Sequence, residues 1–406
     1  MTRSVFESLA WLFAPADDPG SCALVEAPAD WQARLPADAP AIAWGRMPTR
    51  APALARAVGN AVARERSIRG LQVRPGHLEL WDVHRVAPIG WRPRWQRAVR
   101  QALLSGAIVR LGRGPAQPRV ADRIAAEAGQ PGGPVELRIS GDGSARTHVA
   151  GSESRRVLLR LARVGGLKEA HRNRDALIRL GAAGVANVPR LQRSGTTLDV
   201  DWSTEDELAG APVRALSPEL LQQTVEWATG LPRSDGHATA VEERLEVLIR
   251  SFPRFAVELG RALERARERA RDVPGVLEHG DLWAGNLLVA GGRLTGVVDW
   301  DNWHPAGVPG TDVLHLIAMA GRRRPTVELG ELWLERPWQT AHFRSATGAY
   351  WSALGLAFDD DLAWLVAVSW WTAHVTAALR RGRQPAQDPR WVARNVENVA
   401  PVLAAR

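Results

Sequence analysis

The segment Val276–Leu316 decides the fold, and it reads VLEHGDLWAGNLLVAGGRLTGVVDWDNWHPAGVPGTDVLHL. Within it, Asp281 is followed five residues later by Asn286, which stands directly before an apolar run. A Gly-Gly turn at 291–292 leads to a second apolar run that ends on Asp299. Two short strands joined by this turn would bring the three polar side chains into one cleft.

These side chains form a donor set that suits phosphoryl transfer. Carboxylate and amide oxygens that converge on one point are ligands for Mg²⁺, which completes its shell with phosphate oxygens and water. A phosphotransferase also needs one carboxylate that orients the attacking hydroxyl and takes its proton. The alternative for Asp281 and Asn286 is a structural loop, because both residue types favour turns.

The spacing of these residues carries a family resemblance. His279, Asp281 and Asn286 match the H-x-D-x-x-x-x-N pattern of kinase catalytic loops. Asp299 stands where a metal-binding Asp is expected, and the segment Pro-Gly-Thr-Asp312-x-x-His comes after it. The region of about 131–406 therefore resembles the aminoglycoside phosphotransferase and choline kinase superfamily.

The resemblance implies an α+β, two-lobed, protein-kinase-like fold with a β-rich nucleotide-binding lobe at 131–210 and a helical lobe at 211–406. It implies the following roles: Asp281 is the catalytic base, His279 braces the catalytic loop, Asn286 and Asp299 bind Mg²⁺, and Asp312 buttresses the loop from the next helix.

Residues 1–130 lie outside the resemblance. They alternate short apolar strands with Ala/Arg-rich helices, and a Gly/Pro cluster at 129–134 separates them from the nucleotide-binding lobe. We expect a small α/β accessory domain whose role the sequence does not indicate.

The upstream lobe should then hold the nucleotide. A turn between two expected strands suits a hairpin whose backbone amides cover phosphates, and it consists of Gly141, Asp142, Gly143 and Ser144. The superfamily carries a phosphate-binding Lys where this chain has Arg160, and Lys168 is the rival for that role. Glu169 and Asp175 are the candidates for the acidic partner on the next helix.

The segment 202–210, which includes Glu205 and Leu208, resembles the hinge that presents backbone groups to the base.

The expected function is transfer of the γ-phosphoryl group of ATP, or of GTP, to a hydroxyl of an aminoglycoside-, sugar- or amino-alcohol-like molecule. Asp312 comes only 13 positions after Asp299, which leaves no room for the activation segment of a protein kinase. The alternative is a weak or inactive pseudokinase that binds nucleotide or acts as a scaffold, because the usual Lys is missing.

Several residues around the motifs permit two interpretations. Asp301 is either a second acidic ligand or a solvated or capping residue. His304 and His315 are interpreted as packing or hydrogen-bonding residues. Trp283 and Trp303 either pack or contact a substrate ring. The run 322–324 is either a solvated loop or a binding site for a phosphorylated acceptor.

Composition limits the cellular setting. A single Cys precludes an internal disulfide and favours a reducing cytoplasm.

The two halves of the chain differ in charge. Residues 1–200 hold 30 basic and 17 acidic side chains, a net charge of +13, whereas residues 201–406 hold 22 basic and 27 acidic side chains, a net charge of −5. No dense basic run with aromatics occurs, so nucleic-acid binding is not expected. No stretch is judged to approach the ~18 uncharged apolar residues that span a bilayer, so no membrane association is expected. The oligomeric state is left open.

Overall fold

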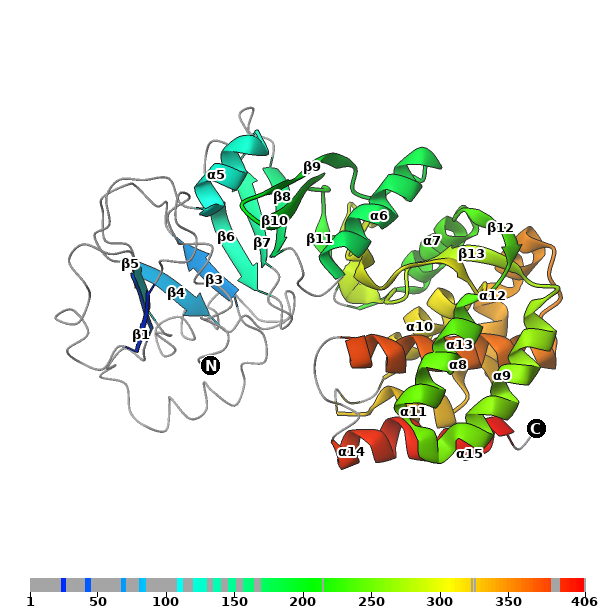
Figure 1. Ribbon diagram of the computed structural model, residues 1–406. Helices are drawn as coiled ribbons and strands as arrows, with labels where there is room; N and C mark the ends of the chain where they lie inside the picture. Colours follow the sequence, from blue (N-terminus) through cyan, green and yellow to red (C-terminus); the bar gives the residue numbers. More distant parts are fainter. Residues whose placement is uncertain are drawn as a thin grey trace. The chain divides into compact units, whose positions relative to one another are not determined.

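The computed structural model describes residues 120–129, 156–163 and 169–404, except 214, 323, 325 and 381–387, together with the backbone of seven short strands upstream of residue 151. The chain divides into two compact units. The first comprises Met1–His171 and Arg190–Glu207, and the second comprises Arg172–Pro189 and Leu208–Arg406. Figure 1 shows their elements.

The first unit is built on a ten-stranded sheet with the order β1-β2-β5-β4-β3-β6-β7-β8-β10-β9. Its strands are β1 Ala23–Glu26, β2 Ala41–Trp44, β3 Ser67–Gly70, β4 Leu80–His84, β5 Ile108–Leu111, β6 Pro134–Ile139, β7 Ala145–Ala150, β8 Arg156–Arg163, β9 Leu191–Thr197 and β10 Val200–Asp206. All pairs are antiparallel except β1 with β2. Because β3 pairs with β6, strands from residues 1–130 continue the sheet of the lobe that is expected to bind nucleotide.

Strands β8 and β10 carry the core of this unit. In β8, Val157, Leu159 and Leu161 are buried on one face of the strand, and Arg160 and Ala162 are buried on the other. Helix α5 (Val120–Glu127) buries Val120 and Ile124 one helical turn apart. The first five residues of the expected hinge, 202–206, belong to β10, so the chain leaves this sheet only after them.

The second unit is mainly helical. It contains most of α6 (Glu169–Ala182), and then α7 Pro218–Thr229, α8 Ala240–Ser251, α9 Ala256–Ala270, α10 Thr311–Ala320, α11 Leu329–Leu334, α12 Ala341–Leu354, α13 Asp360–Arg380, α14 Pro389–Val392 and α15 Ala400–Ala404. Short turns of helix are η1 Pro253–Phe255, η2 Ala284–Asn286, η3 Trp300–Asn302, η4 Pro337–Gln339 and the π-helical η6 Ala393–Glu397.

Helix α13 is the central element of this unit, and α8, α9, α10 and α11 pack around it (Figure 1). The judgement that no stretch reaches bilayer length is wrong for this helix, which has 21 residues and a mean hydropathy of 1.4 in its apolar window. However, 83% of that window is buried inside the protein. A core helix meets the same length and composition criteria as a membrane span, and α13 is such a helix.

Two small sheets position the candidate site. One has the order β11-β14-β15 and the other β12-β13-β16. Their strands are β11 Ala211–Pro212, β12 Arg233–His237, β13 Pro274–Glu278, β14 Leu287–Ala290, β15 Arg293–Val297 and β16 His304–Gly307. The expected α+β class, with a β-rich unit and a helical unit, is confirmed. Division of the chain at residues 130 and 210 stays a prediction.

Candidate active site

The β14–β15 hairpin brings the predicted site residues together. Its register pairs Leu287 with Val297, so Asn286 and Val298 lie at the same end. The Val298 amide donates to the Asn286 carbonyl at 3.0 Å, which places Asp299 beside Asn286. The Asn286 side-chain amide donates to the Asp281 carbonyl at 2.9 Å. One end of the hairpin thus gathers the catalytic loop and the strand that ends at Asp299.

His279 connects the catalytic loop with the strand that ends at Asp299. It is fully buried, its Nδ1 accepts from the Asp281 amide at 3.2 Å, and its Nε2 lies 3.0 Å from the Val298 carbonyl. These partners assign the neutral tautomer with the proton on Nε2. Burial lowers the pKa of His279 below its ordinary value, which agrees with a neutral ring. The His279 ring thus holds the loop and the strand together through one contact to each.

Asp312, near the start of α10, fixes the backbone of the catalytic loop. Its carboxylate accepts from the His279 amide at 2.6 Å and from the Gly280 amide at 2.8 Å. Gly280 has a φ of +76°, and a Cβ there would lie 2.3 Å from the Asn302 carbonyl oxygen, so only glycine fits. Burial, followed by the nearby Glu278 carboxylate, raises the pKa of Asp312 to about 7.

We predict that Asp312→Asn changes the pH dependence of stability. The pKa in the folded state lies above the ordinary value of 3.8, so the folded state holds an extra proton between these values. The wild type therefore loses stability as the pH rises from about 4 to about 7, whereas an amide cannot titrate. Urea unfolding at about pH 5 and about pH 8 should show the wild type losing about 2 kcal/mol relative to the variant. Parallel pH profiles would contradict the raised pKa.

Helix α6 holds the segment after Asp299. The Asn173 side chain accepts from the Trp300 amide at 3.1 Å, and Arg172 donates to the carbonyls of Asp301, at 2.9 Å, and Trp303. The backbone of Asp299 adopts the left-handed helical conformation, with a φ of 73° and a ψ of 61°. Non-glycine residues adopt this conformation rarely and often at functional sites. Sequence reasoning missed Arg172 and Asn173, because neither belongs to the motif.

The residues at this end of the hairpin fit a divalent cation. Since the amide nitrogen of Asn286 is engaged by the Asp281 carbonyl, its oxygen is the atom left to act as a ligand. The Asp299 carboxylate is the other candidate ligand. Within the described ranges, no three His, Cys, Asp or Glu side chains form a metal cluster. Such a donor set suits Mg²⁺, which draws its remaining ligands from phosphates and water.

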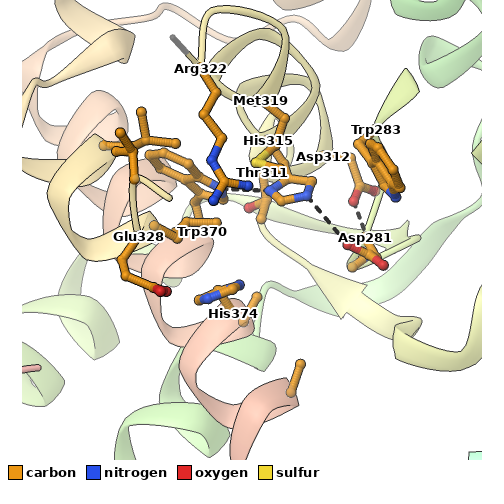
Figure 2. Close-up of a pocket in the computed structure, with 16 residues that line it drawn as sticks. Asp281, Trp283, Thr311, Asp312, His315, Met319, Arg322, Glu328, Trp370 and His374 are labelled. Atoms are coloured by element: carbon orange, nitrogen blue, oxygen red, sulfur yellow. Dashed lines mark hydrogen bonds and ion pairs between the residues drawn. The ribbon is translucent and has the colours of Figure 1, made fainter. Parts of the chain in front are cut away.

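A cavity of about 380 Å³ opens beside Asp281 within the helical unit. Figure 2 shows Asp281 and Trp283 at one side of it and His374 below. Arg322 reaches into the cavity from the end of α10 (Figure 2). Of the two candidates for substrate contact, Trp283 lines this cavity, whereas Trp303 is buried.

His315 lies on the wall of the cavity next to Asp281. Its Nε2 is 3.4 Å from Asp281 Oδ1, and its Nδ1 accepts from the Trp370 indole at 2.9 Å. The interpretation of His315 as a hydrogen-bonding residue describes this contact, but sequence reasoning did not place it against Asp281. His304 lies on β16, where its Nε2 is 3.1 Å from a Glu243 carboxylate oxygen.

The nucleotide-binding candidates of the other unit are partly described. Residues 141–144 and Lys168 lie outside the described residues, as does the side chain of Glu169. Strands β6 and β7, which flank 140–144, pair antiparallel as a hairpin requires. Leu208 comes after β10 and belongs to the helical unit, where it packs against Gly296.

Arg160 and Glu205 form an ion pair inside the sheet of the first unit. They lie on the neighbouring strands β8 and β10, with Arg160 Nη2 2.9 Å and Nε 3.0 Å from Glu205 Oε1. Their side chains are only 6% and 4% exposed. The structure thus gives Arg160, the expected phosphate ligand, a buried carboxylate as partner. Its role toward phosphate stays a prediction.

We predict that Glu205→Leu lowers the free energy of unfolding by about 3 kcal/mol, because it removes a carboxylate that lies against the buried Arg160 charge. The double variant Arg160→Met/Glu205→Leu should recover most of this loss, since an apolar pair replaces the ion pair. Urea titration of wild type, both single variants and the double variant measures the effect. Equal destabilisation in the Glu205→Leu and double variants would contradict a pairing role.

Comparison with known proteins gives a family. The model of the "phosphotransferase enzyme family" matches residues 136–344, which is more than half of the 406-residue chain. A comparison with curated proteins found no match.

Among solved structures, a thermostable mutant of aminoglycoside phosphotransferase APH(4)-Ia is similar at a TM-score of 0.47 and 12% identity, over 71% of this chain and 100% of that one. The macrolide 2'-phosphotransferase MphH from Brachybacterium faecium is similar at a TM-score of 0.43 and 18% identity, over 68% of this chain and 96% of that one. Aminoglycoside phosphotransferase APH(3'')-Id from Streptomyces rimosus, in complex with ADP and streptomycin, is similar at a TM-score of 0.41 and 14% identity, over 61% of this chain and 94% of that one. The assignment itself rests on the family model and its coverage: the chain belongs to the phosphotransferase enzyme family.

Proposed function

We propose that this protein transfers the γ-phosphoryl group of ATP or GTP to a hydroxyl group of a small molecule. The observation that carries the proposal is the convergence of Asp281, Asn286 and Asp299 at one end of the β14–β15 hairpin. The cavity beside Asp281 gives an acceptor a place next to the reacting group. Family membership supports the same class of reaction.

Each residue has a defined task in this proposal. Asp281 orients the acceptor hydroxyl and takes its proton as the oxygen forms a bond to the γ-phosphorus and the bond to the nucleoside diphosphate breaks. Asn286 and Asp299 would hold Mg²⁺, which neutralises charge on the phosphates when it is bound. His279 and Asp312 keep the loop backbone in place through their hydrogen bonds to its amides.

The walls of the cavity combine charged and apolar side chains. Two of its carboxylates have structural tasks: Asp312 binds backbone amides, and Glu328 caps α11 and lies 3.6 Å from Arg394. The third carboxylate belongs to Asp281, the proposed catalytic base. Arg322 adds a positive charge to the wall and Trp283 adds an apolar face, so the cavity suits an acceptor with both polar and apolar parts.

A transfer assay tests the proposal. The full chain is incubated with γ-labelled ATP or GTP, Mg²⁺ and a panel of hydroxyl compounds divided equally among cationic, neutral and anionic members. We expect label to enter at least one of these compounds in a Mg²⁺-dependent reaction. Absence of nucleotide binding would refute the phosphotransferase.

One observation favours the alternative of a weak or inactive kinase. The buried ion pair with Glu205 occupies the guanidinium of Arg160, the residue in the place of the usual phosphate-binding Lys. A protein that binds Mg²⁺-nucleotide but transfers no label to any acceptor or to water would support this alternative.

A further inference from the structure

A series of two polar contacts joins three residues, from the central helix of the helical unit to the catalytic loop. Trp370, on α13, donates from Nε1 to Nδ1 of His315, on α10, at 2.9 Å. On the opposite edge of the ring, His315 Nε2 lies 3.4 Å from Asp281 Oδ1. Figure 2 shows the imidazole between these two partners, at the wall of the cavity. The series thus links a rigid core element to the proposed catalytic base.

The Trp370 contact determines where the imidazole carries its proton. An indole N–H can only donate, so His315 Nδ1 must present its lone pair. A neutral ring then carries its proton on Nε2, the nitrogen that faces Asp281. His315 therefore offers Asp281 a hydrogen-bond donor. It cannot take a proton from the acceptor itself, because neither nitrogen has a lone pair left for one.

A small movement of Asp281 would complete a hydrogen bond with His315 Nε2. His315 Nε2 is buried and forms no hydrogen bond of good geometry within the described residues, although Asp281 lies 3.4 Å away. A buried donor left in this state is unfavourable, because its lost hydration is not replaced by a hydrogen bond. His315 is 9% exposed and fixed by Trp370, whereas the Asp281 side chain is 31% exposed. Asp281 is thus the partner that can turn to complete the bond, as catalytic contacts often do when substrate binds.

We propose that His315 is a positioning residue for Asp281. Its Nε2–H fixes one carboxylate oxygen, so that the other oxygen faces the acceptor hydroxyl in the cavity. Trp370 enforces the tautomer that makes this possible. The proposal rests on the proposed phosphotransferase function and adds to it a residue outside the family motif.

Two substitutions of His315 separate positioning from packing. The Nε2 amide of Gln reaches where the imidazole Nε2–H stands, whereas the shorter amide of Asn reaches only the Nδ1 position. We expect His315→Asn to lower kcat by about 10-fold to 100-fold with little change in KM for the nucleotide. His315→Gln should recover most of the loss. Transfer is measured to the best acceptor of the panel, or to water when no compound is labelled.

Trp370→Phe tests the tautomer, and its neighbour provides the control. Trp371 is also fully buried on α13, and its Nε1 donates to the Asn395 carbonyl at 2.7 Å, away from the cavity. Trp371→Phe therefore loses an indole donor from the same helix without touching His315. Long-range ¹H–¹⁵N correlation spectra identify the signal of His315 by its loss in His315→Gln. We expect an Nε2–H tautomer in the wild type and in Trp371→Phe, and a mixture of tautomers in Trp370→Phe.

The outcomes separate this proposal from the proposed function. An Nδ1–H tautomer or a doubly protonated ring in the wild type would overturn the positioning role. Equal losses of kcat in His315→Gln and His315→Asn would do the same, because they would indicate packing alone. A wild type that binds Mg²⁺-nucleotide but transfers phosphate neither to a compound nor to water overturns both claims. An active wild type with unchanged kcat in His315→Asn overturns only this one.

Discussion

Asp281→Asn should lower kcat for phosphoryl transfer by about 10³-fold to 10⁴-fold, because an amide cannot take the proton of the acceptor hydroxyl. The backbone contacts of the loop should survive, since they involve the amide and carbonyl of Asp281, not its side chain. Nucleotide affinity and the melting temperature should therefore stay close to the wild-type values. Steady-state kinetics with each substrate varied in turn, together with a nucleotide titration, measure both effects.

An exposed aspartate in the segment before the catalytic loop provides the control for the change of charge. Asp272 lies in the turn before β13, outside the cavity. Asp272→Asn makes the same change of charge and should leave kcat and nucleotide affinity at wild-type values. If Asp281→Asn keeps a wild-type kcat, Asp281 is not the base.

Asp299→Ala should abolish the Mg²⁺-dependent part of nucleotide binding, raising Kd on the order of 10²-fold or more, with turnover falling in parallel. The reason is the loss of the carboxylate from a donor set in which Asn286 contributes only an amide oxygen. Thermal shift with Mg²⁺-ATP and Mg²⁺-GTP detects binding, because a ligand that binds only the folded state raises its melting temperature. The shift should be present in the wild type, absent from the variant and absent without Mg²⁺.

The left-handed backbone at Asp299 calls for a second variant. Alanine tolerates this conformation less well than Asp or Asn, so Asp299→Ala also carries a stability cost of about 1 kcal/mol. Asp299→Asn retains a residue suited to the backbone and removes only the charge. Both variants should lose the Mg²⁺-dependent shift. An unchanged nucleotide affinity in Asp299→Asn would remove Asp299 from the metal site.

The local parts of the site could be predicted from the sequence. A tight Gly-Gly turn sets the register of the β14–β15 hairpin, so Asn286 and Asp299 lie at one end whatever the rest of the chain does. The α+β class and the family are confirmed on the same motif region. The chemical roles of these residues stay predictions.

The parts that depend on distant packing could not be predicted. His315 meets Asp281 because α10 lies against the loop that carries Asp281, and its partner Trp370 comes from α13, which packs on α10. Likewise, Arg160 and Glu205 are 45 residues apart, and their pairing depends on how β8 and β10 are aligned. Hydrophobic periodicity indicates which face of a helix is buried but does not identify its neighbour.

The interrupted course of the helical unit limits how the protein can be dissected. This unit takes residues 172–189 from one part of the chain and 208–406 from another. A truncated protein beginning at residue 208 would lack Asn173, which accepts from the Trp300 amide, and Arg172, which binds two carbonyls of the same segment. Any fragment intended to retain Asp299 in its native conformation must therefore include α6, either by an earlier start or by adding the helix as a separate peptide.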